Sequence, residues 1–205
     1  AKAALHVADA ALVVVDGVAG AEVQTEKAWQ VADELGLPRL VVVNRLDRDR
    51  ASLERTLDSV RQTLGRTIIP IQLPIGEAKS FTGVIDLITM KAYTFAADGS
   101  GKMSEAAVPA ALAEAAATAR DALIEMVAEA DESLMEKFFD AGTLTQDELL
   151  TGLSAAARAA KIFPLVCASG LQNIGVQPVL DAVLAHLPSP AERPFTALAN
   201  NQAVT

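Results

Sequence analysis

The sequence predicts an α/β fold in which a parallel sheet with helices on both faces is interrupted by an inserted α+β subdomain. Three observations lead to this prediction. Apolar strand-like runs alternate with amphipathic helical segments over the first third of the chain, as in βαβ units. The alternation stops near residue 74, where short strand-like runs and then helical segments follow one another. It resumes near residue 162 with another apolar run and another amphipathic helix.

The alternating part is predicted from apolar runs and from the glycines that end its helical segments. Residues 39–44 (RLVVVN) are apolar along most of their length, which indicates a strand buried on both faces. The segments 22–36 and 52–65 have apolar side chains at helical spacing and end at Gly36 and Gly65, and glycine favours helix termination. The predicted elements are strands at 10–17, 39–44 and 67–76, and helices at 22–36 and 52–65.

The inserted subdomain is predicted to combine short strands with helices. Short strands are expected within residues 81–103, with a turn from Asp98 to Gly101. Asp131 is a candidate N-cap, and Thr145 and Glu148 have the spacing of a capping box. The predicted helices are 109–130, 131–142 and 145–161.

The chain returns to the alternating pattern in its last part. Residues 162–169 (IFPLVCAS) indicate a buried strand, and residues 175–188 indicate an amphipathic helix with His186 at its solvent-side end. The side chains expected to face inward are Val176, Val179, Leu180, Val183 and Leu187. We therefore divide the chain into an α/β part at 1–73 and 162–190, an inserted subdomain at 74–161, and a linker toward a following domain at 191–205.

Composition and charge restrict the possible partners and compartments. The chain has 17 Lys and Arg against 26 Asp and Glu, a net charge of −9, which argues against direct non-specific nucleic-acid binding by this chain. Cys167 is the single cysteine, so an internal disulfide is impossible and a reducing, cytoplasmic environment is expected. No apolar run approaches the roughly 20 residues that span a bilayer, so no membrane partner is expected.

Polar residues follow two of the predicted strands. Asn44, Arg45 and Asp47 come after the strand 39–44, and Ser169 ends the strand 162–169. Ligands of open α/β sheets bind outside the carboxyl ends of the strands. Two interpretations are open: Asn44 and Asp47 cap a turn and the following helix, or the cluster recognises a planar base. The residues alone favour capping.

Base recognition would give each polar group a defined partner. A single carboxylate, that of Asp47, can accept from both the N1–H and the 2-amino group of guanine, and adenine has no such pair of donors. The amide of Asn44 can bond the base N7, and the stem or planar head of Arg45 can lie along the base face. Backbone N–H groups around Ser169 and Gly170 can bond the base O6.

The cluster resembles the N-K-x-D element of GTP-binding proteins, with Arg45 in place of the lysine. Residues 168–171 (ASGL) are similar to the second base-contacting element, with Gly170 where alanine is usual. The longer segments 11–29, 72–93 and 173–190 resemble bacterial elongation factor G, and the resemblance covers nearly the whole chain. It implies the GTPase domain of a translational GTPase, with a P-loop-NTPase-like sheet that is incomplete at the N-terminus. The nucleotide-binding residues that it implies are Asn44, Arg45, Asp47, Ser169, Gly170 and Leu171.

The phosphate-binding half of a GTPase site is not recognisable in this sequence. The pattern G-x-x-x-x-G-K-[ST] has one near match, residues 96–103, but Ala96 and Met103 replace the first glycine and the hydroxyl residue. The resemblance places the P-loop, the first switch and the D-x-P-G-H segment before residue 1, and His6 is interpreted as an ordinary helix residue. We therefore expect GTP or GDP as the ligand, Mg²⁺ only in the complete protein, no catalytic residue or metal ligand here, and no GTP hydrolysis by this chain alone.

The resemblance implies the ribosome as a partner, with the inserted subdomain in contact with the ribosomal stalk protein. A role of the insert as a stability element of the domain is the alternative. A second hypothesis is a non-catalytic nucleotide- or protein-binding module derived from such a domain. An intact P-loop upstream in the parent gene would support the first, and a natural start near residue 1 the second. The sequence leaves open whether the protein is a true elongation factor or a paralogue, and whether it acts in translocation or in ribosome recycling.

Overall fold

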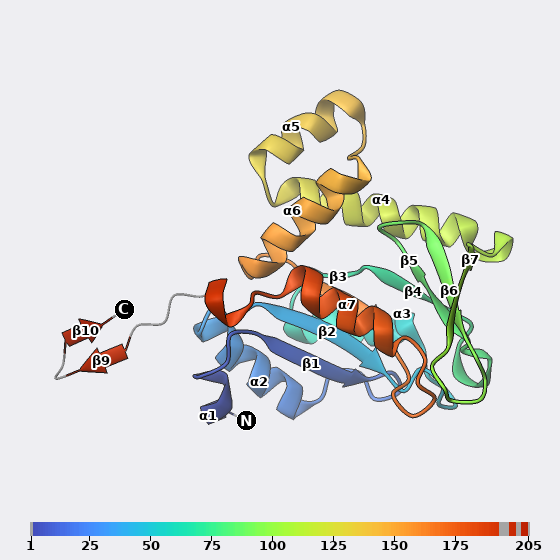
Figure 1. Cartoon of the computed structure of the whole chain (residues 1–205), viewed down its shortest axis with the longest axis horizontal. Helices are drawn as coiled ribbons and strands as arrows, with labels where there is room; N and C mark the ends of the chain where they lie inside the picture. Colours follow the sequence, from blue (N-terminus) through green and yellow to red (C-terminus); the bar gives the residue numbers. More distant parts are fainter. Residues whose placement is uncertain (1, 193–196, 200–201, 205) are drawn as a thin grey trace.

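The protein contains one parallel and one antiparallel four-stranded sheet, with helices packed around them (Figure 1). The computed structural model describes residues 2–192, 197–199 and 202–204. The predicted α/β fold with a parallel sheet and an inserted α+β unit is confirmed. Among these residues, no helix is both long enough and apolar enough to cross a membrane.

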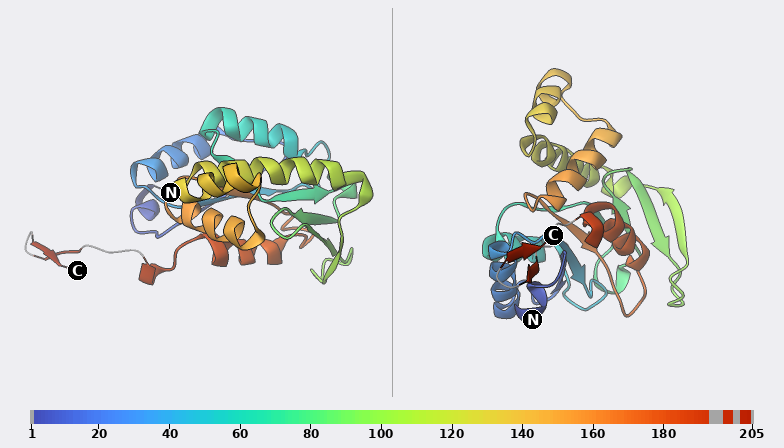
Figure 2. Two further views of the ribbon diagram at one scale, coloured as in Figure 1. Left: turned by 90° about the horizontal axis from the view of Figure 1, so that it is seen from above. Right: turned by 60° about the vertical axis from the view of Figure 1, so that its left-hand side comes forward.

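The parallel sheet has the strand order β1-β2-β8-β3. Its inner strands β2 and β8 are apolar and buried along almost their whole length, because helices cover both faces. Helices α2 and α3 lie on one face and α7 on the other (Figure 2). The elements of this part are β1 (Ala11–Asp16), β2 (Arg39–Asn44), β3 (Ile68–Pro70), β8 (Phe163–Cys167), α1 (Lys2–Leu5), α2 (Val23–Glu34), α3 (Leu53–Leu64) and α7 (Val176–His186).

The antiparallel sheet has the strand order β4-β5-β6-β7. Its strands are β4 (Gln72–Ile75), β5 (Gly83–Asp86), β6 (Lys91–Phe95) and β7 (Met103–Ala107). The expected single strand at 67–76 is wrong, because Ile71 divides it between two sheets. Its N–H donates to the carbonyl of Leu165 in the parallel sheet (2.9 Å), and its carbonyl accepts from the N–H of Leu87 in the insert (3.0 Å). The antiparallel sheet thus begins at Gln72, two residues before the boundary predicted from the sequence.

Gln72 and Cys167 join the two sheets beside this crossing. Both residues are buried. The N–H of Cys167 donates to Gln72 Oε1 (3.2 Å), and the Cys167 thiol lies 3.7 Å from the Gln72 carbonyl oxygen. Burial raises the pKa of the Cys167 thiol far above its ordinary value. We call this pair of residues the sheet junction.

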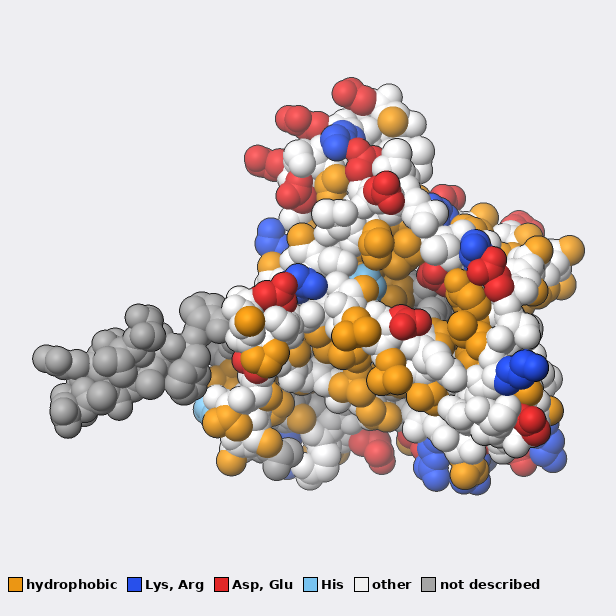
Figure 3. Space-filling model, viewed as in Figure 1, with side chains coloured by type: hydrophobic (Ala, Val, Ile, Leu, Met, Phe, Trp, Pro, Cys, Tyr) orange, Lys and Arg blue, Asp and Glu red, His pale blue; other side chains and the backbone are white. Residues whose placement is uncertain are grey.

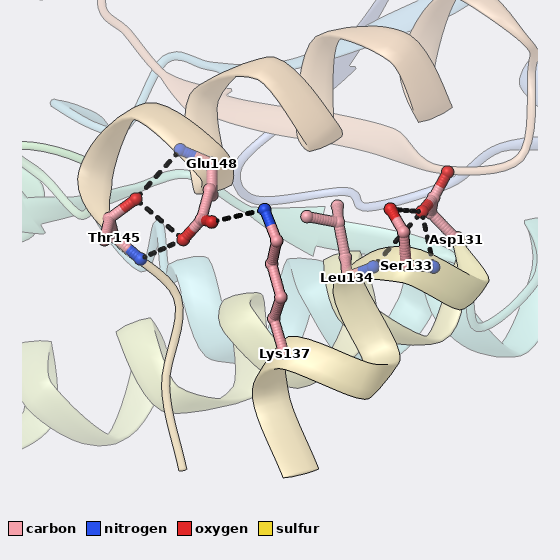
Figure 4. A network of polar contacts seen from close by, with 6 residues as sticks. All are labelled: Asp131, Ser133, Leu134, Lys137, Thr145 and Glu148. Carbon is pink, nitrogen blue, oxygen red and sulfur yellow. Dashed lines mark hydrogen bonds and ion pairs between the residues drawn. The ribbon is translucent and has the colours of Figure 1, made fainter. Parts of the chain in front are cut away.

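Two helices of the insert, α5 and α6, begin with the N-caps that the sequence predicts (Figure 4). The Asp131 carboxylate accepts from the N–H groups of Ser133 (2.9 Å) and Leu134 (3.2 Å). Thr145 and Glu148 form the reciprocal capping box, and Lys137 lies 2.6 Å from Glu148 Oε1. The Lys137 ammonium and Thr145 lower the pKa of Glu148 to about 2. The helices are α4 (Ala113–Glu129), α5 (Glu132–Ala141) and α6 (Gln146–Arg158), and the 3₁₀ turns are η1 (Ala78–Ser80), η2 (Ala110–Leu112) and η3 (Pro190–Glu192).

Helix α6 packs against α7, so the buried side of α7 differs from the one predicted from the sequence. The buried residues of α7 are Pro178, Val179, Ala182 and His186. The expectations that His186 faces solvent and that Leu180 faces inward are both wrong: His186 is 2% exposed and Leu180 is 58% exposed. His186 Nδ1 lies 3.0 Å from Ser154 Oγ on α6. Burial, with a smaller contribution from the charge of Arg158, lowers the pKa of His186 to about 4.

The two remaining predictions concern the ends of the chain. His6 lies in a turn just after α1 and is exposed, so its assignment to a helix is wrong by one residue. The predicted linker at 191–205 falls partly on residues 193–196, 200–201 and 205, which lie outside the described residues. Within it, β9 (Ala197–Ala199) and β10 (Gln202–Val204) pair antiparallel.

Candidate functional site

Three strands of the parallel sheet end at the same edge. Asp16 at the end of β1 is paired in register with Asn44 at the end of β2, and Cys167 at the end of β8 is paired with Val43. The loops that follow these strands are therefore neighbours. Asn44 at the end of β2 and these loops include every site residue that the sequence predicts, and the structure brings the end of β2 and the loop after β8 into contact.

Asn44 connects the two loops through its side-chain oxygen. Asn44 Oδ1 accepts from the N–H of Arg45 (2.8 Å) and from the N–H of Gly170 (2.9 Å). A longer backbone bond runs beside it, from the N–H of Leu46 to the carbonyl of Ala168 (3.4 Å). Because Oδ1 is engaged twice, the NH₂ group of Asn44 is the part that remains available as a donor at this edge.

Arg45 is held by Asp16, a residue that the sequence analysis treated only as the end of a strand. Arg45 Nη1 lies 2.7 Å from Asp16 Oδ2, and Asp16 Oδ1 accepts from the N–H groups of Val18 (2.8 Å) and Ala19 (3.3 Å). Burial acts to raise the pKa of Asp16, but the hydrogen bonds from Arg45 and from the two backbone groups hold it below its ordinary value. Asp16 could have been found from the strand order, since neighbouring parallel strands end side by side.

Asp47 has an acceptor atom without a donor. Its side chain is partly buried, and Asp47 Oδ1 is buried with no hydrogen-bond partner among the described residues. The helix-capping interpretation of Asp47 is not supported, because α3 begins at Leu53 with Ser52 as its N-cap residue. An unpaired buried acceptor costs about 1–3 kcal/mol, so a donor supplied by a ligand would be stabilising here.

The loop after β8 is closed by backbone hydrogen bonds. Ser169 is fully buried; its N–H donates to the Ile174 carbonyl (2.9 Å), and its carbonyl accepts from the Ile174 N–H (3.0 Å). Gly170 is exposed, and a Cβ there would lie 3.7 Å from Asn44 Oδ1, an ordinary contact. Space therefore does not require glycine at residue 170. Leu171 is 73% exposed, and its N–H makes no hydrogen bond to the described residues.

The family model named Elongation factor Tu GTP binding domain matches residues 1–189. The chain belongs to the elongation factor Tu GTP-binding domain family. The members of this family are GTPases that bind GTP and Mg²⁺. The resemblance to the GTPase domain of a translational GTPase is thus confirmed at the level of the family.

One solved structure is similar to this protein over most of the length of this chain. The protein is similar to the crystal structure of ttk003000868 from Thermus thermophilus, with a TM-score of 0.84 and 41% sequence identity. The match covers 94% of this chain and 28% of that one. The chain therefore spans little more than a quarter of the length of this relative.

Within this GTP-binding domain, the near match to the P-loop pattern has a different place in the fold. Residues 96–102 form the turn between β6 and β7 of the insert, with the N–H of Ala96 donating to the carbonyl of Lys102 (3.0 Å). A strand follows them rather than a helix, so the rejection of this segment as a P-loop is confirmed. In the part of the chain that the structure describes, no group of three or more His, Cys, Asp or Glu side chains could hold a metal ion.

Proposed function

We propose that this GTP-binding domain holds the guanine base of GTP or GDP at the carboxyl edge of its parallel sheet, as the base-recognition part of a cytoplasmic, elongation factor G-like translational GTPase. The observation that carries this proposal is that Asp47 Oδ1 is buried and has no hydrogen-bond partner within the described part of the chain. It lies beside the contact that Asn44 makes between two loops. A pre-formed edge with unused polar groups is suited to a flat ligand that brings its own donors and acceptors.

Asp47 selects guanine in this proposal. Its carboxylate accepts from N1–H and from the 2-amino group, which are adjacent donors on one side of the base. Adenine would leave the carboxylate unmatched. A site that relies on such pairing can discriminate by ~10⁴-fold or more.

The remaining polar groups have complementary roles. The NH₂ group of Asn44 donates to the base N7, because its oxygen already accepts from two backbone N–H groups. Among Ser169, Gly170 and Leu171, the first two backbone N–H groups are engaged, so the N–H of Leu171 is the donor for the base O6. Arg45 lies against the base face, and its ion pair with Asp16 limits the orientations of its guanidinium.

The direct test is Asp47→Asn in the intact protein. The new NH₂ group would oppose the 2-amino group of guanine, whereas the carbonyl at C2 of xanthine would accept from it. We expect the preference for GDP over xanthosine diphosphate to reverse, measured by competition binding. Asp49→Asn is the control, because Asp49 is an exposed carboxylate two residues away. An unchanged ratio in Asp47→Asn would refute base recognition by Asp47.

We place phosphate and Mg²⁺ binding outside residues 1–205, because this sequence contains no G-x-x-x-x-G-K-[ST] pattern. Phosphoryl transfer depends on positioning and charge stabilisation by those parts. The isolated chain should therefore hydrolyse no GTP and bind GDP weakly. Isothermal titration with GDP checks this, and a dissociation constant at or below about 1 μM, the value of a −8.2 kcal/mol interaction, would contradict it.

We also propose that the insert contacts the ribosome, with the stalk protein as the partner. Carboxylates gather over α5 at the far end of the insert (Figure 3), where Glu132, Glu136 and Asp140 are exposed at helical spacing. Phe139 lies among them and is 78% exposed. An exposed aromatic side chain is suited to anchor a partner protein.

The variant Phe139→Ala tests this contact. We expect lower recovery of purified ribosomes, and of the stalk protein alone, in a pull-down, because the variant loses the exposed apolar anchor. Val23→Ala on α2 is the control, since Val23 is also an exposed apolar residue and lies outside the insert. Equal recovery with both proteins would remove α5 as the contact.

A further inference from the structure

We infer that the tip of the β6–β7 hairpin positions the loop after β8, so that the insert sets the geometry of the base site. This inference rests on the proposed function, because the positioned loop carries Gly170 and Leu171. The tip consists of residues 96–102 and the loop of residues 168–175. The two segments are more than sixty residues apart in the sequence, and they meet beside the start of α7 (Figure 1).

Two side chains connect the loop and α7 to the hairpin tip. The NH₂ group of Asn173 donates to the carbonyl of Gly99 (3.4 Å), and the NH₂ group of Gln177 donates to the carbonyl of Gly101 (2.8 Å). On its other side, the loop is bonded through the Gly170 N–H to Asn44. The loop is therefore held between the end of β2 and the insert.

The hairpin tip is ordered by its own hydrogen bonds. The carboxylate of Asp98 accepts from the N–H of Ser100 (2.9 Å), and the hydroxyl of Ser100 accepts from the N–H of Lys102 (3.2 Å). Hydrogen bonds to Ser100 lower the pKa of Asp98, so its carboxylate stays charged at neutral pH. A turn that is fixed in this way can act as a support for the loop.

The hairpin tip packs closely against Asn173 and Gln177 at Gly101 and has open space at Gly99. Gly101 is buried, and a Cβ there would lie 2.4 Å from Asn173 Nδ2 and 3.0 Å from Gln177 Nε2. A Cβ at Gly99 would meet nothing within 4 Å. Both glycines have positive φ, +71° and +72°, so alanine carries a similar backbone cost at either position. Only alanine at 101 also displaces the two side chains that hold the loop.

This difference gives a matched pair of variants, Gly101→Ala and Gly99→Ala. The first readout is amide hydrogen exchange of the chain without nucleotide. Gly101→Ala should speed exchange at Gly170 by about fivefold, the equivalent of one weakened hydrogen bond, and Gly99→Ala should not. Equal rates at Gly170 in the two variants would overturn the positioning role.

The second readout is the dissociation rate of a fluorescent GDP from the intact protein. Gly101→Ala should speed release by about fivefold, as expected for one lost hydrogen bond, while Gly99→Ala stays within about twofold of the parent protein. If the parent protein binds no GDP, the proposed function fails, whereas the exchange experiment still decides the positioning role. Normal release from a well-folded Gly101→Ala variant would overturn the link to the base site.

Gln177→Ala provides a second variant in case Gly101→Ala folds poorly. It removes the donor to Gly101 and also the Gln177 Oε1 atom, which is buried without a partner among the described residues, so the global stability should change little. Gln172→Ala is its control, because Gln172 is exposed in the same loop and its side chain makes no hydrogen bond to the described residues. Faster exchange at Gly170 is expected only in Gln177→Ala, and its absence would overturn the inference.

Discussion

The two four-stranded sheets of this domain differ in how far their strands are buried and in where their polar contacts lie. In the parallel sheet, β2 and β8 are buried along the strands, and the polar groups lie at the strand ends. In the antiparallel sheet, all five residues of β7 are exposed, and polar groups that contact the rest of the domain lie at the hairpin tip and at Gln72 of β4. The parallel sheet therefore supplies a fixed edge, while the outer strand β7 of the insert supplies surface and the hairpin tip supplies contacts.

The largest effect that would test this comparison is a core truncation. Leu165→Ala in β8 removes a fully buried side chain and should lower the free energy of unfolding by about 2–5 kcal/mol. Met103→Ala in β7 removes one that is 40% exposed and should cost less than about 1 kcal/mol. Urea unfolding of both variants measures the difference. Equal losses would mean that β7 is as important to the core as β8.

A pH effect of intermediate size should come from His186, where the insert packs on the parallel sheet. Its pKa is lowered from 6.5 to about 4, so the unfolded chain binds the proton more readily. Stability is complete above pH 6.5 and is lost as the pH falls toward 4, by about 2 kcal/mol between pH 7.5 and 5.

Urea unfolding at pH 7.5 and pH 5 should show this loss in the parent protein but not in His186→Gln. His6→Gln is the control and should keep the loss, because His6 is exposed and lies outside the contact between α6 and α7. Glu148 does not interfere, because its pKa is lowered from 4.5 to about 2 and its contribution is lost only below pH 4.5. If His186→Gln keeps the full pH dependence, another group titrates in the interface.

The smallest effect belongs to the helix caps of the insert. Thr145→Ala removes the hydroxyl that accepts from the Glu148 N–H (3.3 Å) and should cost about 1 kcal/mol. Thr151→Ala is the control, because Thr151 is exposed within the same helix. Thermal unfolding compares the two. A cost as large as that of Leu165→Ala would show that α6 anchors the whole domain.

The sequence predicted those parts of the fold that depend on local patterns. The Asp131 cap, the Thr145–Glu148 capping box and the alternation of strands and helices outside residues 67–76 were predicted correctly. The expected strand at 67–76 was wrong because its apolar run continues through Ile71 without a break. Hydropathy does not reveal that the backbone N–H and carbonyl of Ile71 form hydrogen bonds with different sheets. Leu180 and His186 were misassigned because α6, which covers α7, is an element from elsewhere in the chain.

The sequence predicted the residues of the candidate site but not the residues that hold them in place. Asn44, Arg45, Asp47 and Ser169 stood out because polar residues ended apolar runs, whereas Gly170 and Leu171 were added by the resemblance to GTP-binding proteins. The roles of all six residues in nucleotide binding stay predictions. Asp16 was missed because its partner Arg45 is 29 residues away. The contacts of Asn173 and Gln177 with the hairpin tip have no periodic signal in the sequence, since they join segments that are adjacent only in the folded chain.

The sheet junction has a consequence for thiol chemistry. Cys167 is the single cysteine, is fully buried, and bonds to Gln72 through its N–H. The thiolate is the form that reacts, and the raised pKa and the burial of Cys167 keep it unreactive while the junction is closed. A disulfide reagent such as Ellman's reagent would therefore label only molecules in which the two sheets have locally separated. Its labelling rate, compared with that of a free thiol, measures how often β4 and β8 part in the native protein.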